Sequence, residues 1–157
     1  MKPICFALAM LALGCYSAPE HVDVATLRFE NGPLMRPGEN CLRCHKAGGQ
    51  AAQHPWSAAG TVFMSSTSDE GAPGVTVRVV DADKREVTLT TNAAGNFYTA
   101  EPLRAPLRLR LEHLGRNKEM PEEAPAGSCN ACHSSPDPAG NAKGRIFLPL
   151  ADSRADD

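Results

Sequence analysis

Two copies of one short pattern hold four of the chain's six cysteines: Cys41-Leu42-Arg43-Cys44-His45 and Cys129-Asn130-Ala131-Cys132-His133. In each copy two thiols stand three positions apart, and an imidazole follows directly. With 5 histidines in 157 residues, a histidine would follow both cysteine pairs by chance in roughly one case in a thousand. The two histidines therefore belong to the pattern.

Cys-x-x-Cys-His is the pattern by which c-type haem is attached to a polypeptide. Two thiols on one helical turn can reach the two vinyl groups on one porphyrin edge, while the next residue places its imidazole on the iron. We therefore expect two covalently bound haem c groups. The expected thioether-forming cysteines and proximal iron ligands are Cys41, Cys44, Cys129, Cys132, His45 and His133.

The same thiols allow other interpretations. Two Cys-x-x-Cys pairs could form a tetrahedral zinc site, in which the histidines are incidental, or the pairs could form disulfides. A thioredoxin-like redox motif would need a βαβ context, and the sequence between the pairs lacks helix-length apolar periodicity. The repeated histidine favours haem. The alternative is a non-catalytic β-sandwich lipoprotein whose two cysteine pairs bind zinc or form disulfides.

Each haem iron would take its sixth ligand from elsewhere in the chain. Met120 is the first candidate, because it lies in an irregular stretch nine residues before Cys129, where a loop can deliver a thioether to iron. His54, nine residues after His45, is the second candidate and could serve either haem. The alternative for each is structural, as a methionine that fills a gap in the core or as a histidine on the surface.

The N-terminus has the plan of an export signal, so residues 1–14 are expected to be a signal peptide. Lys2 precedes an apolar run over residues 4–13, which is far shorter than the roughly 20 apolar residues needed to span a bilayer. Ala12-Leu13-Gly14-Cys15 resembles a bacterial lipoprotein processing site. This resemblance implies that Cys15 is lipidated and anchors the protein to a membrane surface. Thiols outside the cytoplasm are either oxidised or occupied by a cofactor.

Composition excludes several classes of protein. A chain of 157 residues with 42% hydrophobic residues supports one modest domain and is too short for a large multidomain enzyme. The net charge of -2 provides no basic field for nucleic acid. The sequence shows no Ser/His/Asp set, paired-carboxylate cleft or phosphate-binding loop, so we expect an electron carrier rather than an enzyme. The enzymatic alternative is a haem peroxidase or reductase.

The residues between the two motifs have the period of two that is typical of β-strands. Apolar and polar residues alternate around Val75, Val77 and Val79, around Val87 and Leu89, and around Leu107, Leu109 and Leu111, and residues 60–64 open this run of strands. Turn residues occupy 69–74, 81–85 and 92–96. The pattern predicts five or six short antiparallel strands in a small, mainly-β sandwich, with only short helical turns around the motifs.

Part of this region resembles a known family. Gly60-Thr61-Val62, Gly71-Ala72-Pro73-Gly74-Val75-Thr76-Val77 and Thr90-Thr91-Asn92-Ala93-Ala94-Gly95-Asn96-Phe97 are similar to the carboxypeptidase regulatory-like (transthyretin-like) β-sandwich repeat. Lys84 stands where that family has a turn glycine. The resemblance implies a structural, non-catalytic sandwich. With its flanking motifs, the whole chain resembles an exported bacterial multihaem cytochrome c with a β-sandwich insert.

These observations predict a dihaem c-type cytochrome that transfers single electrons at a bacterial cell envelope, in the periplasm or on a lipid anchor, and that exchanges electrons with redox partner proteins. A sandwich whose entering and leaving strands end on one side would bring the two motifs together, close enough for their haems to exchange electrons. The expected segments are a signal peptide (1–14), a linker (15–40), a first haem-binding segment (41–56), the β-sandwich (57–113), a second haem-binding segment (114–149) and a disordered tail (150–157).

Overall fold

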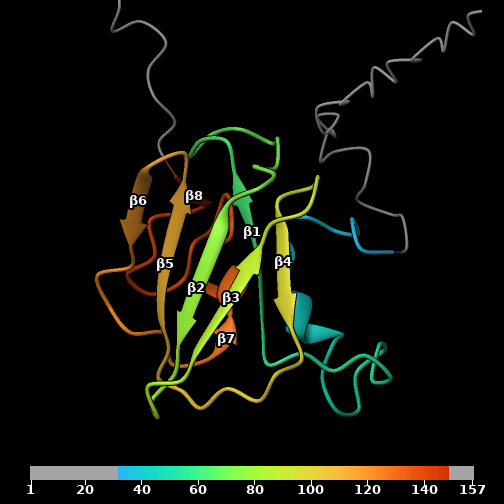
Figure 1. Ribbon diagram of the computed structural model, residues 1–157. Coiled ribbons are helices and arrows are strands. Elements are labelled where there is room, and N and C mark those ends of the chain that lie inside the picture. Colours follow the sequence, from blue (N-terminus) through green and yellow to red (C-terminus); the bar gives the residue numbers. More distant parts are fainter. Residues whose placement is uncertain (1–31, 149–157) are drawn as a thin grey trace, which may run out of the picture.

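The computed structural model of the protein describes residues 32–148, which form eight strands and two single helical turns (Figure 1). In chain order they are η1 (Cys41–Arg43), β1 (Ala58–Phe63), β2 (Thr76–Val80), β3 (Glu86–Thr90), β4 (Asn96–Thr99), β5 (Arg108–His113), β6 (Arg116–Glu119), β7 (Gly127–Ser128), α1 (Cys129–Cys132) and β8 (Ile146–Phe147). The expectation of a mainly-β fold with short helical turns is confirmed. The expected signal peptide, Cys15 and the tail over 150–157 lie outside the described residues.

The strands form two sheets. One has the order β3-β2-β5-β6 with every neighbouring pair antiparallel. The other has the order β4-β1-β7, with β8 also paired to β1. In this second sheet β1 and β4 are antiparallel, whereas β7 and β8 run parallel to β1 over two residues each. Figure 1 shows β2, β3 and β5 side by side, with the fainter β1 behind them.

The alternating strands bury the side chains that the sequence pattern selects. Val77 and Val79 of β2 are fully buried, and Leu109 and Leu111 of β5 face the same side. These residues share one core with residues of the other sheet, including Phe97 of β4. The two sheets therefore enclose a single hydrophobic core, as expected for a small sandwich.

β1 departs from the alternating pattern, since all six of its residues are buried. Ala58 and Val62 belong to the core shared by the sheets. Thr61 instead bonds Gly38, three residues before the first motif, and Asn130 within the second, and η1 and α1 both contact β1. This strand is thus covered by the core on one face and by the motif-bearing segments on the other.

The turn after β2 is held by one carboxylate. Oδ1 of Asp81 accepts hydrogen bonds from the backbone N–H groups of Asp83 and Arg85, each at 2.9 Å. Lys84 in the same turn has a φ of 66°, a left-handed conformation that glycine adopts without steric cost. The lysine therefore holds a backbone conformation that favours glycine.

The sheets extend beyond the segment in which strands were expected. β6, β7 and β8 all follow residue 113 and pair with β5 or β1. The segment that carries the second motif is therefore built into the sandwich, and the boundary at residue 113 does not end the sheets. Among residues 32–148 no helix is long and apolar enough to cross a membrane.

Candidate functional site

The first motif forms a single tight turn. Its 3-10 helix η1 is followed by a backbone hydrogen bond from His45 N to Cys41 O at 3.0 Å. The next loop folds back on the motif, because Ala51 N donates to Cys44 O and Trp56 N donates to His45 O, at 3.1 and 3.0 Å. Two thiols and an imidazole are thus presented by one closed loop, which runs from η1 to the start of β1.

His45 is oriented by a backbone carbonyl. Its ring is buried, and its Nδ1 lies 2.9 Å from the carbonyl oxygen of His54. A carbonyl can only accept, so Nδ1 carries the proton and donates, which leaves the lone pair of Nε2 as the metal-binding atom. Histidines that bind metals commonly have their other ring nitrogen held in this way.

The second motif repeats this arrangement on a different element. α1 is one turn of α-helix, and His133 N donates to Cys129 O at 2.9 Å. Nδ1 of His133 lies 2.9 Å from the carbonyl oxygen of Gly144, in the loop that precedes β8. The two motifs therefore present an imidazole Nε2 in the same tautomer, each with two cysteines within the preceding turn.

A stack of aromatic rings joins the first motif to the sandwich. The His45 ring lies 3.5 Å from the Trp56 ring, centroid to centroid, with an interplanar angle of 7°. Trp56 in turn stacks on Tyr98 of β4 at 4.2 Å and 13°. The plane of the His45 imidazole is therefore fixed both by a hydrogen bond and by ring contact, and the stacked rings connect it to β4.

The two cysteines of each motif lie in different environments. Burial raises the pKa of the Cys41 thiol to about 11 and that of Cys129 to about 12. Cys129 is part of the hydrophobic core, whereas Cys41, Cys44 and Cys132 are half-buried. All four cysteines are free thiols. Cys129 is therefore the one cysteine of the two motifs that the hydrophobic core encloses.

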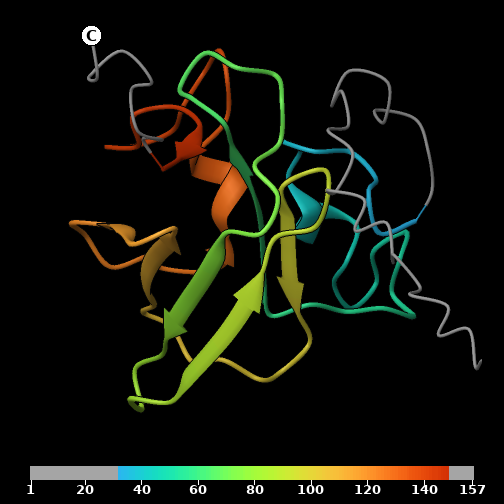
Figure 2. The same cartoon turned by 45° about the horizontal axis from the view of Figure 1, so that its top comes forward.

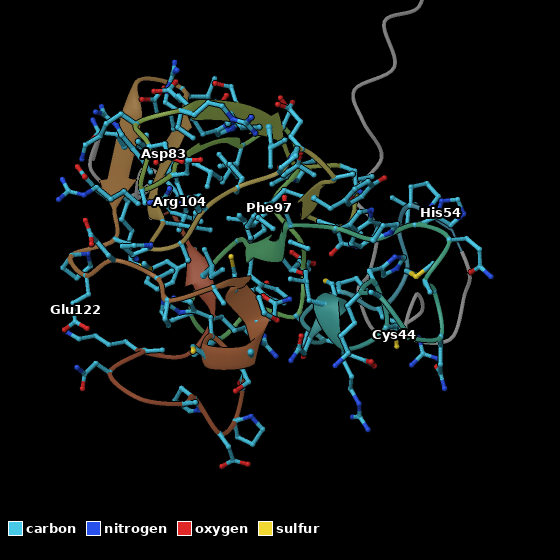
Figure 3. The ribbon with its side chains drawn as sticks, turned by 90° about the horizontal axis from the view of Figure 1, so that it is seen from below. Cys44, His54, Asp83, Phe97, Arg104 and Glu122 are labelled. Carbon is cyan, nitrogen blue, oxygen red and sulfur yellow. The ribbon has the colours of Figure 1, made fainter. Side chains whose placement is uncertain are left out.

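The structure brings the two motifs together. Asn130 of α1 donates from Nδ2 to the carbonyl oxygen of Glu39, at 3.0 Å, and Ser128 donates from its hydroxyl to the side-chain oxygen of Asn40. Figure 3 shows η1 and α1 next to each other, Figure 2 shows α1 beside β1, and both turns contact β1. The expectation that the strands return the two motifs to one side of the sandwich holds.

The two candidate sixth ligands have different surroundings. Met120 is half-buried and packs against the hydrophobic core, and its backbone N–H donates to Leu109 O at 3.0 Å. The His54 side chain is exposed, and Figure 3 shows it on the outer side of the loop that follows η1. Its backbone carbonyl holds Nδ1 of His45, on the side of the ring away from Nε2.

The donor set of each motif is the one that haem attachment requires. Each motif offers two free thiols one turn from an imidazole whose Nε2 is free to bind iron. Across the part of the chain that the structure describes, no three His, Cys, Asp or Glu side chains converge to hold an ion. A tetrahedral zinc site would need four such ligands.

Sequence reasoning did not find Asn130, Gly144 or the orienting role of the His54 carbonyl. Gly144 and His54 act through backbone oxygens, which any residue supplies, so their types carry no signal. Asn130 occupies one of the two positions between the cysteines of its motif, and these positions can hold any residue. Only the structure shows that its side chain is buried.

Comparison with known proteins gives no identification: no protein-family model matches this chain, and no similar protein was found among the curated proteins or the solved structures.

Proposed function

We propose that this chain is an exported dihaem c-type cytochrome that carries single electrons at a bacterial cell envelope. The observation that supports it best is the repeated geometry of His45 and His133. Each follows a pair of free cysteines by one turn, and each directs Nδ1 to a backbone carbonyl at 2.9 Å. A proximal haem ligand needs this tautomer.

The hydrogen bond alone is not specific to a haem ligand. Nδ1 of His113 also lies near a backbone carbonyl, that of Gly74, at 3.1 Å. His113 has no cysteine pair before it, and it lies at the end of β5. The proposal therefore rests on thiols and oriented imidazole together, and His113 provides a matched control for it.

The chain's own residues would divide the work as follows. Cys41 and Cys44 would tether one haem and Cys129 and Cys132 the other, through thioether bonds. His45 and His133 would bind iron through Nε2. When bound, haem c supplies a one-electron couple, and the polypeptide places it, limits its exposure and sets its potential.

The surroundings of the proposed proximal ligands also bear on the sixth ligands. The backbone carbonyl of His54 holds Nδ1 of His45, and the His54 imidazole is exposed, so it could bind an iron only if its loop brought it there. Met120 can bind iron only by leaving its contacts with the core. Both residues are kept as candidates for the sixth position.

Location and partners are part of the same proposal. We propose that the chain is exported to the periplasm or held at a membrane surface by a lipid on Cys15, and that it exchanges electrons with redox partner proteins. We assign it no enzymatic activity. A lipid anchor is compatible with this role, because it keeps a small carrier near membrane-bound donors and acceptors.

The proposal is tested by expressing the full chain in a bacterial host with and without the machinery for haem c attachment. We expect a red protein whose haem remains on the polypeptide in a denaturing gel, with two haems per chain by pyridine haemochrome assay. His133→Ala or Cys132→Ala should remove one of the two haems, since only the second motif is damaged. The control variant His113→Ala should retain both.

Colourless protein from the competent host would overturn the proposal. Colourless protein that holds one zinc ion per chain, lost when Cys132 is replaced, would support the β-sandwich binding module instead. Loss of haem in His113→Ala to the same extent as in His133→Ala would show that the assay reports folding rather than ligation.

A further inference from the structure

A buried polar cluster lies between the two motifs. It consists of Thr61 of β1, Asn96 of β4 and Asn130 of α1, whose exposed fractions are 0%, 6% and 3%. The Thr61 hydroxyl donates to Asn96 Oδ1 at 2.7 Å, and it accepts from Asn130 Nδ2 at 3.1 Å. The Thr61 backbone N–H donates to Asn130 Oδ1 at 3.2 Å. We call these three residues the polar clamp.

The clamp also holds the segment that leads into the first motif. The Gly38 N–H donates to the Thr61 hydroxyl at 2.8 Å, and Asn130 Nδ2 donates to Glu39 O at 3.0 Å. Asn96 Nδ2 donates to Met35 O at 3.0 Å. One amide side chain, Asn130, thus bonds a strand of the sandwich and the backbone two residues before Cys41, while itself lying between Cys129 and Cys132.

Burial of this cluster makes its geometry well defined. A buried polar group that loses its partner carries a desolvation penalty that an exposed one does not, so a fully satisfied buried network holds one arrangement and disfavours others. No buried side-chain nitrogen or oxygen among residues 32–148 lacks a partner. A hydrophobic contact in the same place would tolerate sliding, whereas these hydrogen bonds fix direction as well as distance.

The chemistry of haem attachment does not require the asparagine. It needs the two cysteines and the histidine, and in the first motif the residues between the cysteines are Leu42 and Arg43, which are half-buried and exposed. The corresponding position in the second motif holds a buried side chain with three hydrogen bonds to chain regions far away in sequence.

We infer that Asn130, through Thr61, is a positioning residue that fixes the two haem-binding motifs relative to each other and so sets the electronic coupling between their haems. This inference rests on the proposed function. Beyond the proposed function, the inference states that the two haems form one fixed pair and are not two independent carriers on a common sandwich.

The test compares Asn130→Ala with Asn117→Ala, which removes the same amide from an exposed position in β6. In full-length haem-loaded protein, we expect Asn130→Ala to keep two haems but to weaken the magnetic interaction between them in the ferric EPR spectrum. The separation of the two midpoint potentials should change as well. Asn117→Ala should match the wild type in both measurements.

Hydrogen exchange on the same preparations gives a second readout. In Asn130→Ala the Thr61 amide loses its acceptor, so it should exchange roughly tenfold faster. In Thr61→Val it is the Gly38 amide that loses its acceptor, and this amide should show a similar increase. Thr61→Ser keeps the hydroxyl and should behave as the wild type in both the exchange and the EPR measurements. This pair decides the matter if Asn130→Ala does not mature.

Two failures are distinguishable. Protein that takes up no haem overturns the proposed function together with the inter-haem role. Protein with two haems and an unchanged EPR interaction in both Asn130→Ala and Thr61→Val overturns only the present inference and leaves the cytochrome proposal standing.

Discussion

Gly60→Ala is the substitution whose effect follows most directly from the packing. Gly60 lies in β1 opposite Phe97 of β4. A Cβ at this position would lie 2.7 Å from Cζ of Phe97, 2.9 Å from its Cε1 and 2.9 Å from Cβ of Cys129. Carbon atoms do not approach so closely, so either the aromatic ring or the helical turn α1 must move.

The expected cost can be worked out from two opposing effects. Overpacking of a buried site costs about 1–3 kcal/mol, and replacing glycine restricts the unfolded chain, which returns about 0.4–1 kcal/mol. We expect the free energy of unfolding to fall by about 1–2 kcal/mol overall. Because the displaced turn carries the second motif, we also expect less haem at Cys129 and Cys132, with the haem at Cys41 and Cys44 retained.

The assay is urea unfolding followed by circular dichroism, with haem counted by pyridine haemochrome. Phe97→Leu serves as the second arm of a double-mutant cycle, because a shorter side chain frees part of the space that the new methyl group needs. We expect Gly60→Ala to cost roughly half as much in the Phe97→Leu background as in the wild type. An equal cost in both backgrounds, or no cost in either, would refute the packing argument.

Three further predictions concern the turns and the thiols. Lys84→Gly should raise the free energy of unfolding by about 0.5–1 kcal/mol in thermal or urea unfolding, because glycine adopts the positive φ without strain; a decrease would contradict this. In the haem-free chain, iodoacetamide at pH 8 should label Cys132 well before Cys129, since the core encloses Cys129 and burial raises its pKa to about 12; peptide mass spectrometry showing equal labelling would count against it. Hydrogen bonds from backbone N–H groups, that of Arg85 foremost, lower the pKa of Asp81 in the folded state, so its stabilising effect is present above the unfolded pKa and is lost as pH falls through the folded pKa. Acid unfolding of Asp81→Asn should accordingly begin from a less stable state and depend less on pH below about 4 than that of the wild type.

Strands in which apolar and polar residues alternate could be predicted from the sequence, whereas strands without this alternation could be predicted only in part. Val77 and Val79, with polar neighbours, mark β2 because one face of its sheet is solvated. β7 and β8 are two residues long and owe their existence to β1, so no local periodicity announces them. Their parallel pairing depends on where the chain returns, which is a property of the whole fold.

The candidate site, too, could be predicted from the sequence only in part. The cysteines and histidines of the motifs are defined by type and spacing, which the sequence displays. Their orientation depends on the carbonyls of His54 and Gly144, and their relative placement on Asn130. Backbone oxygens have no sequence signature, and the partners of Asn130 lie 69 and 91 residues away along the chain, beyond the reach of any local pattern.

The position of β1 in its sheet has a consequence for how the protein is made. The residues of β1 are synthesised early, whereas those of its parallel neighbours β7 and β8 are among the last described residues to be synthesised. Contacts of such long range slow folding and delay it until synthesis is nearly complete. Throughout that delay the sulfur of Cys129, which the finished core encloses, stays open to solvent and to any attachment enzyme. The order of the strands thus keeps the second motif accessible until the last strands pair, and under the proposed function its haem would be attached within that period.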